Sequence, residues 1–222
     1  MLRTGIAGLM AAMVLMWPVQ KYDGSFRAQM LPVQIDSHSL FVSRYEVTST
    51  SWLRCYSEGG CTHKITATTL AGLFPATGVN WQDVNQYLKW ANDQAGGGLR
   101  LPTLAEWRVI DRALVHAKTP PLFTDPRMAW ATNYGQEKTI GGPVQRSGSF
   151  STTPDGIGDL DGNVWEWTAS CFRSDFGILC PAYVAAGEHE ATVSIFVRDP
   201  ASGGCATGTP PTHLGFRLVA DR

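Results

Sequence analysis

Apolar side chains recur at helical spacing in the stretch from residue 80 to residue 96. The positions that fall on one face are Trp81, Val84, Leu88 and Ala91. Asn80 precedes them as a suitable N-cap, and the three consecutive glycines 96–98 would end the helix. The polar residues between them are predicted to face water, and they include Gln82, Asp83, Gln86 and Lys89. The pattern therefore predicts one amphipathic helix that begins after Asn80.

A second helix is predicted shortly after the glycines. Thr103 and Glu106 have the spacing of a capping box, and Pro102 stands just outside the helix. The apolar positions that this helix would turn toward the core are Trp107, Ile110 and Leu114. We expect the helix to end before the proline pair 120–121.

The segment before residue 60 combines a strand with a short helix. Residues 40–47 are rich in β-branched and aromatic side chains, which predicts a first strand. Thr48 is a candidate N-cap for a short helix that carries Trp52, Leu53 and Cys55 and ends at the glycine pair 59–60. Residues 62–78 are predicted to form a loop.

The second half of the chain predicts strands and long loops. From residue 129 onward, short apolar runs are separated by Gly and Pro. Trp165 and Trp167 alternate with Glu166 and Thr168, which favours an extended segment with buried aromatic rings. Together these elements predict an α+β domain, in which two helices pack on a small, irregular antiparallel sheet joined by much loop.

Charge and the N-terminal pattern narrow the class of protein. The chain has 222 residues, a formal net charge of −1 and no clustered basic excess, so nucleic-acid binding is not expected. Residues 5–19 form an apolar run that is typical of a signal peptide, although no small-x-small cleavage site follows at once. We expect residues 1–20 to be a signal peptide or membrane anchor, 21–37 a linker and 38–222 one domain. That domain would be periplasmic or otherwise extracytoplasmic, either secreted or anchored.

The cysteines agree with an oxidising compartment. There are five, and none stands in a Cys-x-x-Cys pair. Cys55 and Cys61 enclose a short loop with two glycines, and Cys171 and Cys180 enclose a similarly short segment. Each pair is a candidate disulfide, while Cys205 could compete for either member of the second pair.

The run from Asp159 to Glu166 is the leading candidate for a binding site. Asp159, Gly162, Val164 and Glu166 offer carboxylate and carbonyl oxygens at the spacing of a calcium loop. The residues alone also fit a tight turn before a buried strand, with Glu166 bonded to backbone amides. Both interpretations place Glu166 between two buried tryptophans, where it needs a partner.

Several motifs together resemble one family. They are residues 100–107 (Arg-Leu-Pro-Thr-Leu-Ala-Glu-Trp), 160–167 (Leu-Asp-Gly-Asn-Val-Trp-Glu-Trp) and 214–218 (Leu-Gly-Phe-Arg-Leu), with 44–48 and 79–83 in the same order. The chain resembles the formylglycine-generating enzymes, or sulfatase-modifying factors, over residues 38–222. The resemblance implies a variant of the C-type lectin fold. The motif residues that carry it are Arg100, Glu106, Trp107, Asn163, Trp165, Trp167, Gly215, Phe216 and Arg217.

The resemblance also implies metal sites. It favours structural calcium at Asp159 and Glu166, with carbonyl oxygens from Gly162 and Val164. A second calcium site of the family would lie near residues 133–134, where the downstream acidic ligand is not obvious, and this site is left open. Family oxidases hold copper(I) between two cysteines, a soft metal between soft ligands.

The copper cysteines are missing from the corresponding segment of this chain. Residues 188–198 contain none, and Cys205 stands alone nearby. If a catalytic centre exists, the candidate residue is Cys205, with Arg198 and Arg217 near it, and copper could bind there only with a further ligand. His189 is a weak candidate for that ligand, and Arg217 is more simply explained as an anchor bonded to backbone carbonyls.

Two functions follow from this pattern. The first is an exported relative of the formylglycine-generating enzymes that acts in oxidative modification or maturation of a partner protein. If active, it would be a divergent oxidase without the usual cysteine pair. The alternative is a non-catalytic, lectin-like accessory module that binds an exported enzyme or complex.

Overall fold

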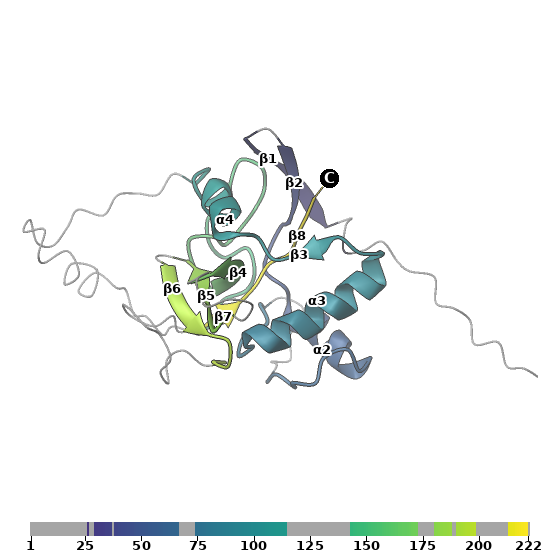
Figure 1. Cartoon of the computed structure of the whole chain (residues 1–222). Helices are drawn as coiled ribbons and strands as arrows, with labels where there is room; N and C mark the ends of the chain where they lie inside the picture. Colours follow the sequence, from purple (N-terminus) through teal and green to yellow (C-terminus); the bar gives the residue numbers. More distant parts are fainter. Residues whose placement is uncertain are drawn as a thin grey trace, which may run out of the picture.

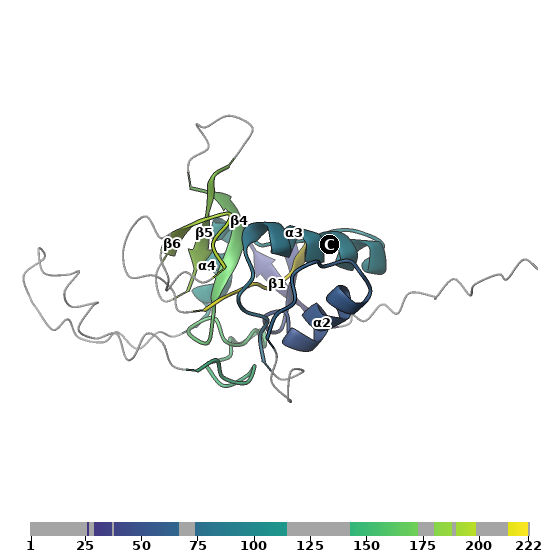
Figure 2. The same ribbon diagram turned by 90° about the horizontal axis from the view of Figure 1, so that it is seen from below.

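The computed structural model describes residues 26, 29–36, 38–66, 74–114, 143–172, 180–187, 190–198 and 213–221. Two small sheets and three helices make up the described part (Figure 1). Helices α2 and α3 lie together on one side of the molecule, and α4 lies beside the sheet that contains β4–β6 (Figure 2). This α+β architecture confirms the predicted fold class. Within the described residues, no helix has the length and hydrophobicity needed to cross a membrane.

The first sheet has the strand order β1-β2-β8-β3 and is antiparallel. Its strands are β1 (Met30–Ile35), β2 (His38–Ser43), β3 (Leu99–Arg100) and β8 (Val219–Asp221). The predicted strand 40–47 is thus divided: β2 ends at Ser43, and the backbone that follows bonds to the chain just before β8, with Val47 N donating to Phe216 O at 2.8 Å. Strand β1 lies in the segment assigned to a linker from sequence.

The second sheet has the strand order β6-β5-β4-β7. Its strands are β4 (Trp165–Cys171), β5 (Ala182–Ala186), β6 (Glu190–Ser194) and β7 (Leu214–Gly215). Strands β4, β5 and β6 are antiparallel, whereas β7 runs parallel to β4. The predicted extended segment around Trp165 and Trp167 is confirmed as β4.

All three predicted N-caps are confirmed. Helix α2 (Ser49–Ser57) is capped by Thr48, α3 (Trp81–Ala95) by Asn80 and α4 (Leu104–Asp111) by Thr103. Both α3 and α4 have a complete capping box, and α3 ends at Gly96 in the left-handed conformation, as its glycines suggested. These helix ends could be predicted because their hydrogen bonds are local in sequence.

The buried face of α3 differs from the prediction. Its buried residues are Asp83, Val84, Tyr87, Trp90 and Ala91, while Trp81 and Leu88 are half-buried. Asp83, which was expected to face water, accepts hydrogen bonds from the guanidinium of Arg198 at 2.6 and 3.0 Å. This part of the prediction was wrong because the compensating cation lies 115 residues away in the sequence.

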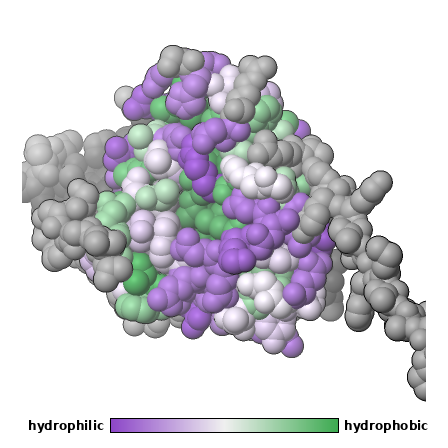
Figure 3. Space-filling view, turned by 45° about the vertical axis from the view of Figure 1, so that its right-hand side comes forward, coloured by the Kyte–Doolittle hydropathy of each residue, from purple (hydrophilic) through white to green (hydrophobic). Residues whose placement is uncertain are grey.

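The core consists of two clusters. The larger one packs α2 and α3 against both sheets through rings that include Trp52, Tyr87, Trp167 and Phe216. The smaller one packs α4 against β1 and β2 around Trp107 and Leu40. On one face of the molecule, apolar residues lie at the centre of a ring of hydrophilic ones (Figure 3).

Candidate functional site

The candidate loop leads into a fully buried ion pair between Glu166 and Arg217. The two side chains are 1 % and 0 % exposed. Arg217 Nε donates to the two carboxylate oxygens of Glu166 at 2.8 and 2.6 Å. Trp107 Nε1 donates to Glu166 Oε2 at 2.9 Å, and Arg217 Nη2 donates to Gly158 O at 3.0 Å. The cation that Glu166 needs is therefore supplied by the protein.

Arg217 is an anchor, as the simpler interpretation held, but its main partner is a carboxylate. The sequence predicted that Arg217 bonds to backbone carbonyls alone. In the structure it bonds to the carboxylate of Glu166 as well as to the carbonyl of Gly158. Arg198, which was placed near it in a possible catalytic centre, instead pairs with Asp83 at the start of α3. Cys205 and His189 lie outside the described residues.

Asp159 holds the loop in place through backbone amides. Its carboxylate accepts hydrogen bonds from Gly148 N and, at 2.9 Å, from Phe150 N. Asp159 and Asn163 both have positive φ angles, 64° and 72°, which short polar side chains tolerate. Asn163 Oδ1 accepts from Gln145 N at 2.8 Å. The loop is thus closed by its own polar side chains.

The predicted calcium ligands already take part in hydrogen bonds within the protein. Every carboxylate oxygen of Asp159 and Glu166 already accepts a hydrogen bond from the protein. Gly162 O accepts from Val164 N at 3.0 Å, and a Cβ at Gly162 would clash with the ring of Phe150, which explains the glycine without a metal. Each of these oxygens has a further lone pair that could ligate a cation, so the calcium site stays a prediction from the sequence. The segment of the second family site, 133–134, lies outside the described residues.

Calcium dependence of thermal stability tests this site. If the four residues bind calcium, the melting temperature rises with calcium concentration, because a ligand that binds only the folded state stabilises it. The sequence-based assignment therefore predicts a higher melting temperature by calorimetry in millimolar calcium than in excess chelator. An equal melting temperature in both conditions, or a rise that Asp159→Asn leaves unchanged, would contradict the assignment.

The buried ion pair itself predicts a large effect on stability. Glu166→Ala leaves the guanidinium of Arg217 buried without a carboxylate, which costs about 3–5 kcal/mol of unfolding free energy. Asp93→Ala is the matched control, because it breaks the exposed pair between Lys89 and Asp93 on α3 and should cost less than about 1 kcal/mol. Urea unfolding measures both, and equal losses would contradict the central role of the buried pair.

Glu46 is a functional candidate that sequence reasoning missed. Its side chain is 2 % exposed, and neither carboxylate oxygen has a hydrogen-bond partner among the described residues. Burial raises the pKa of Glu46 well above its usual range, and the nearby charges of Glu166 and Asp159 raise it further. The charge of Arg217 and the backbone amide of Glu46 lower the pKa but do not offset burial. Leu40 and Val42 are buried at the same parity as Glu46, but Arg44 between them is exposed and β2 ends at Ser43, so alternation alone could not have placed Glu46 inside.

The raised pKa of Glu46 predicts a pH-dependent stability. A carboxyl group whose folded pKa is raised favours folding while it is protonated, so this contribution falls as pH rises from the ordinary glutamate range to the folded pKa. Glu46→Gln removes the decline. We expect its unfolding free energy, relative to the native chain, to be higher at about pH 8 than at about pH 5. Asp155→Asn, a change at an exposed carboxylate, controls for the lost charge. A pH-independent difference for Glu46→Gln would contradict the assignment.

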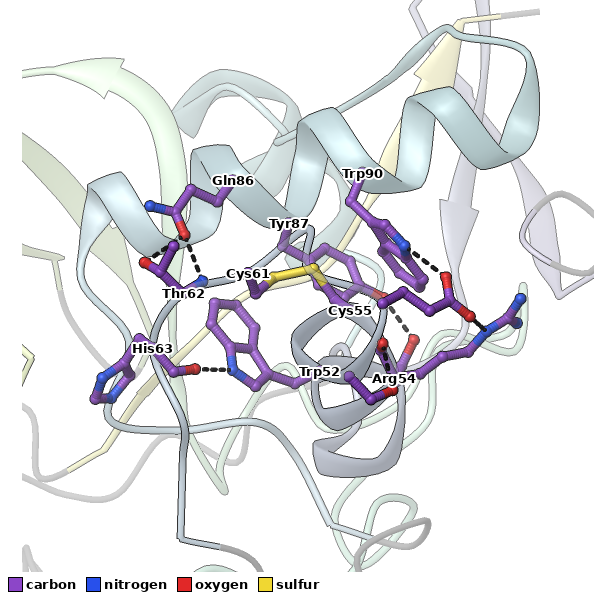
Figure 4. Close-up of a disulfide and its surroundings, with 12 residues drawn as sticks. Trp52, Arg54, Cys55, Cys61, Thr62, His63, Gln86, Tyr87 and Trp90 are labelled. Atoms are coloured by element: carbon purple, nitrogen blue, oxygen red, sulfur yellow. Dashed lines mark hydrogen bonds and ion pairs between the residues drawn. A yellow bond between two sulfur atoms is a disulfide. The ribbon is translucent and has the colours of Figure 1, made fainter.

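Both candidate disulfides are present. Cys55 pairs with Cys61 and Cys171 with Cys180, with Cα–Cα distances of 5.3 and 5.8 Å. The first disulfide joins α2 to the turn that follows it and lies beneath α3 (Figure 4). Next to it, Trp52 Nε1 donates to His63 O at 2.9 Å, so the disulfide and the indole hold the same turn. These cysteines are structural.

A second motif cluster fixes the C-terminal strand. The guanidinium of Arg100 donates to Glu106 at 2.7 Å and to Asp221 at 2.7 Å. Glu106 also closes the capping box of α4 by accepting from Thr103 N at 2.7 Å. The contact with Asp221, 121 residues away, was not predicted. The family motif at residues 100–107 is therefore explained by the packing of α4 and β8.

A pocket of about 590 Å³ opens beside Glu46. Its walls come from the start of β1, the extended segment 43–48, helix α2 and residue Tyr87 of α3. Ser51 Oγ and the hydroxyl of Tyr87 lie 2.6 Å apart in this wall. Burial raises the pKa of Tyr87, so this hydroxyl stays neutral. Within the described residues, no three His, Cys, Asp or Glu side chains form a metal-binding group.

The fold, with its buried carboxylate–guanidinium pair, defines an α+β module of two small sheets and three helices. The sulfatase-modifying factor enzyme 1-like domain matches residues 10–222, and the chain belongs to this family of formylglycine-generating enzymes and their relatives. The matched region also includes the segment that carries β1.

Named relatives share about half of the chain. An inactive C-alpha-formylglycine-generating enzyme 2 of Bos taurus is 32 % identical over 110 residues, which are 46 % of this chain and 34 % of that protein. A formylglycine-generating enzyme of Streptomyces coelicolor is 30 % identical over 112 residues, again 46 % and 34 %. A serine/threonine-protein kinase pkn1 of Chlamydia caviae is 30 % identical over 102 residues, 46 % and 15 %. The chain thus spans about a third or less of these relatives' length.

Solved structures share the fold. Treponema denticola variable protein 1 superposes with a TM-score of 0.57 at 14 % identity, over 87 % of this chain and 95 % of that one. PvdO from Pseudomonas aeruginosa gives a TM-score of 0.54 at 18 % identity, over 87 % and 90 %. At these identities the likeness defines the fold alone.

Proposed function

We propose that this chain is a non-catalytic accessory module with the formylglycine-generating-enzyme fold. It binds a partner protein outside the reducing cytosol and assists the maturation of that partner. It does so without the copper oxidation chemistry of the family. The compartment is inferred from the two disulfides, which persist where the environment is oxidising.

The observation that carries this proposal is the pairing of the cysteines. The sequence has five, and four are joined in two disulfides, which leaves 5 − 4 = 1 thiol, that of Cys205. Copper(I) in the family oxidases needs two thiolates, and a disulfide sulfur offers none. The residues present therefore do not fit a two-thiolate copper site. The similarity to a Bos taurus protein whose name marks it as inactive also supports a non-catalytic function.

A formylglycine-generating oxidase is the second candidate function, because proteins named as formylglycine-generating enzymes are similar to this chain. The formylglycine-generating enzyme of Streptomyces coelicolor matches it at 30 % identity. For this chain to share that activity, Cys205 would need a second copper ligand from elsewhere. A direct assay separates the two functions.

The assay is mass spectrometry of a Cys-x-Pro-x-Arg peptide incubated with the copper-loaded full chain under oxygen. We expect the peptide to remain unchanged, whereas an active family enzyme run in parallel converts its cysteine to an aldehyde. A thiol titration of the unfolded, unreduced chain should give one free thiol, which verifies that the protein assayed carries both disulfides.

Aldehyde formation would overturn the accessory function. Loss of that product in Cys205→Ser, with its retention in His189→Ala, would then assign the chemistry to Cys205. The reverse pattern would assign it to His189.

A further inference from the structure

The pocket beside Glu46 has positively charged side chains in its wall. Its lining includes Arg44 and Arg54, and the one acidic residue in that lining is Glu46. Both carboxylate oxygens of Glu46 are buried, so a ligand in the pocket does not contact them. The raised pKa of Glu46 also favours its neutral form. The charges that a ligand meets in this pocket are therefore positive.

The two guanidinium groups differ in the partners that they already have. Arg54 Nε lies 2.9 Å from Glu58 Oε1, so its charge is partly balanced. Arg44 is exposed, and its guanidinium has no ion pair or hydrogen bond with the described residues. A guanidinium offers N–H donors in a planar fork that matches the two oxygens of a carboxylate. Arg44 is thus the group in the wall that is available to an anionic ligand.

Apolar residues lie next to this charge. A Cβ placed on Gly156 would be 3.1 Å from Leu31 Cδ1 and 3.8 Å from Arg44 Nη2, so the guanidinium lies close to the Leu31 side chain. Met30, Val47 and Leu218 also line the pocket. The volume of about 590 Å³ lies within the range of small-molecule sites. A pocket of this composition suits a ligand with an apolar body and one anionic end.

We propose that this pocket binds a carboxylate attached to an apolar body, carried by a free acid or by the C-terminus of a peptide, and that the carboxylate pairs with the guanidinium of Arg44. The apolar body lies against Leu31 and Val47. The hydroxyls of Thr48 and Thr50, at the start of α2, are further donors in the same wall. This site goes beyond the proposed accessory function, and neither depends on the other.

Binding is measured by titration calorimetry on the full chain with hydrocinnamate and with its amide, which has the same shape and no charge. The measurement is made at about pH 6, where an ordinary carboxylic acid is ionised. We expect the acid to bind at least about tenfold more tightly than the amide, because a charge-assisted hydrogen bond is roughly twice as strong as a neutral one.

Arg44→Gln tests the assigned partner. It should reduce the preference for the acid to about threefold or less, whereas Arg112→Gln, the same change at an exposed arginine that follows α4, should retain it. Arg44→Lys keeps the charge but loses the planar fork, so it should bind the acid more tightly than Arg44→Gln does. Because Arg44 is exposed and unpaired among the described residues, none of these changes should alter the folding of the chain.

Equal affinity for the acid and the amide, no binding of either, or an unchanged preference in Arg44→Gln would each overturn the proposal. Equal affinities of Arg44→Lys and Arg44→Gln for the acid would contradict a role for the charge of this side chain. N-acetylated glycyl-phenylalanine with a free carboxyl end separates the two sources of the ligand. Binding of hydrocinnamate alone would identify a small-molecule acid, and binding of both would include the C-terminus of a peptide.

Discussion

The ion pair between Glu166 and Arg217 is the contact on which the rest of the domain depends. Glu166 lies on β4 of the second sheet, and Arg217 lies between β7 of that sheet and β8 of the first. Trp107 connects α4 to this pair by donating to Glu166, and Gly158 O connects the loop before β4 by accepting from Arg217. Because a buried ion is costly unless it is paired and fully hydrogen-bonded, all four parts must be in place together. The pair thus fixes how the two sheets meet.

The polar residues of the loop follow from the same constraint. Arg217 can satisfy one carboxylate closely, so Asp159 depends on the backbone amides of Gly148 and Phe150. Glu46 has no hydrogen bond to an amide of another residue, and burial raises the pKa of its carboxyl, which favours the neutral form. The arrangement explains how protein donors close a loop that has the spacing of calcium ligands.

Sequence patterns predicted the parts of the fold whose causes are local. The N-cap Asn80 of α3, the capping box of α4 and the strand around Trp165 and Trp167 depend on residues a few positions apart. The pairs Glu166–Arg217 and Asp83–Arg198 join residues 51 and 115 positions apart, and no periodicity in the sequence predicts them. The motif at 100–107 was visible because of its resemblance to a family, but its physical reason, the contact of Arg100 with Asp221, required the structure.

Glu46 is a buried residue that the stability of the fold does not require. A domain that only had to hold its sheets together would be more stable with an apolar residue at this position, since the carboxyl loses hydration and gains no partner in return. The disulfides and the Glu166–Arg217 pair already supply the rigidity that buried polar groups are sometimes thought to provide. Violations of local consistency in natural proteins concentrate at functional sites. A buried carboxyl without a hydrogen-bond partner among the described residues is therefore better explained by a function of this region than by what the fold requires.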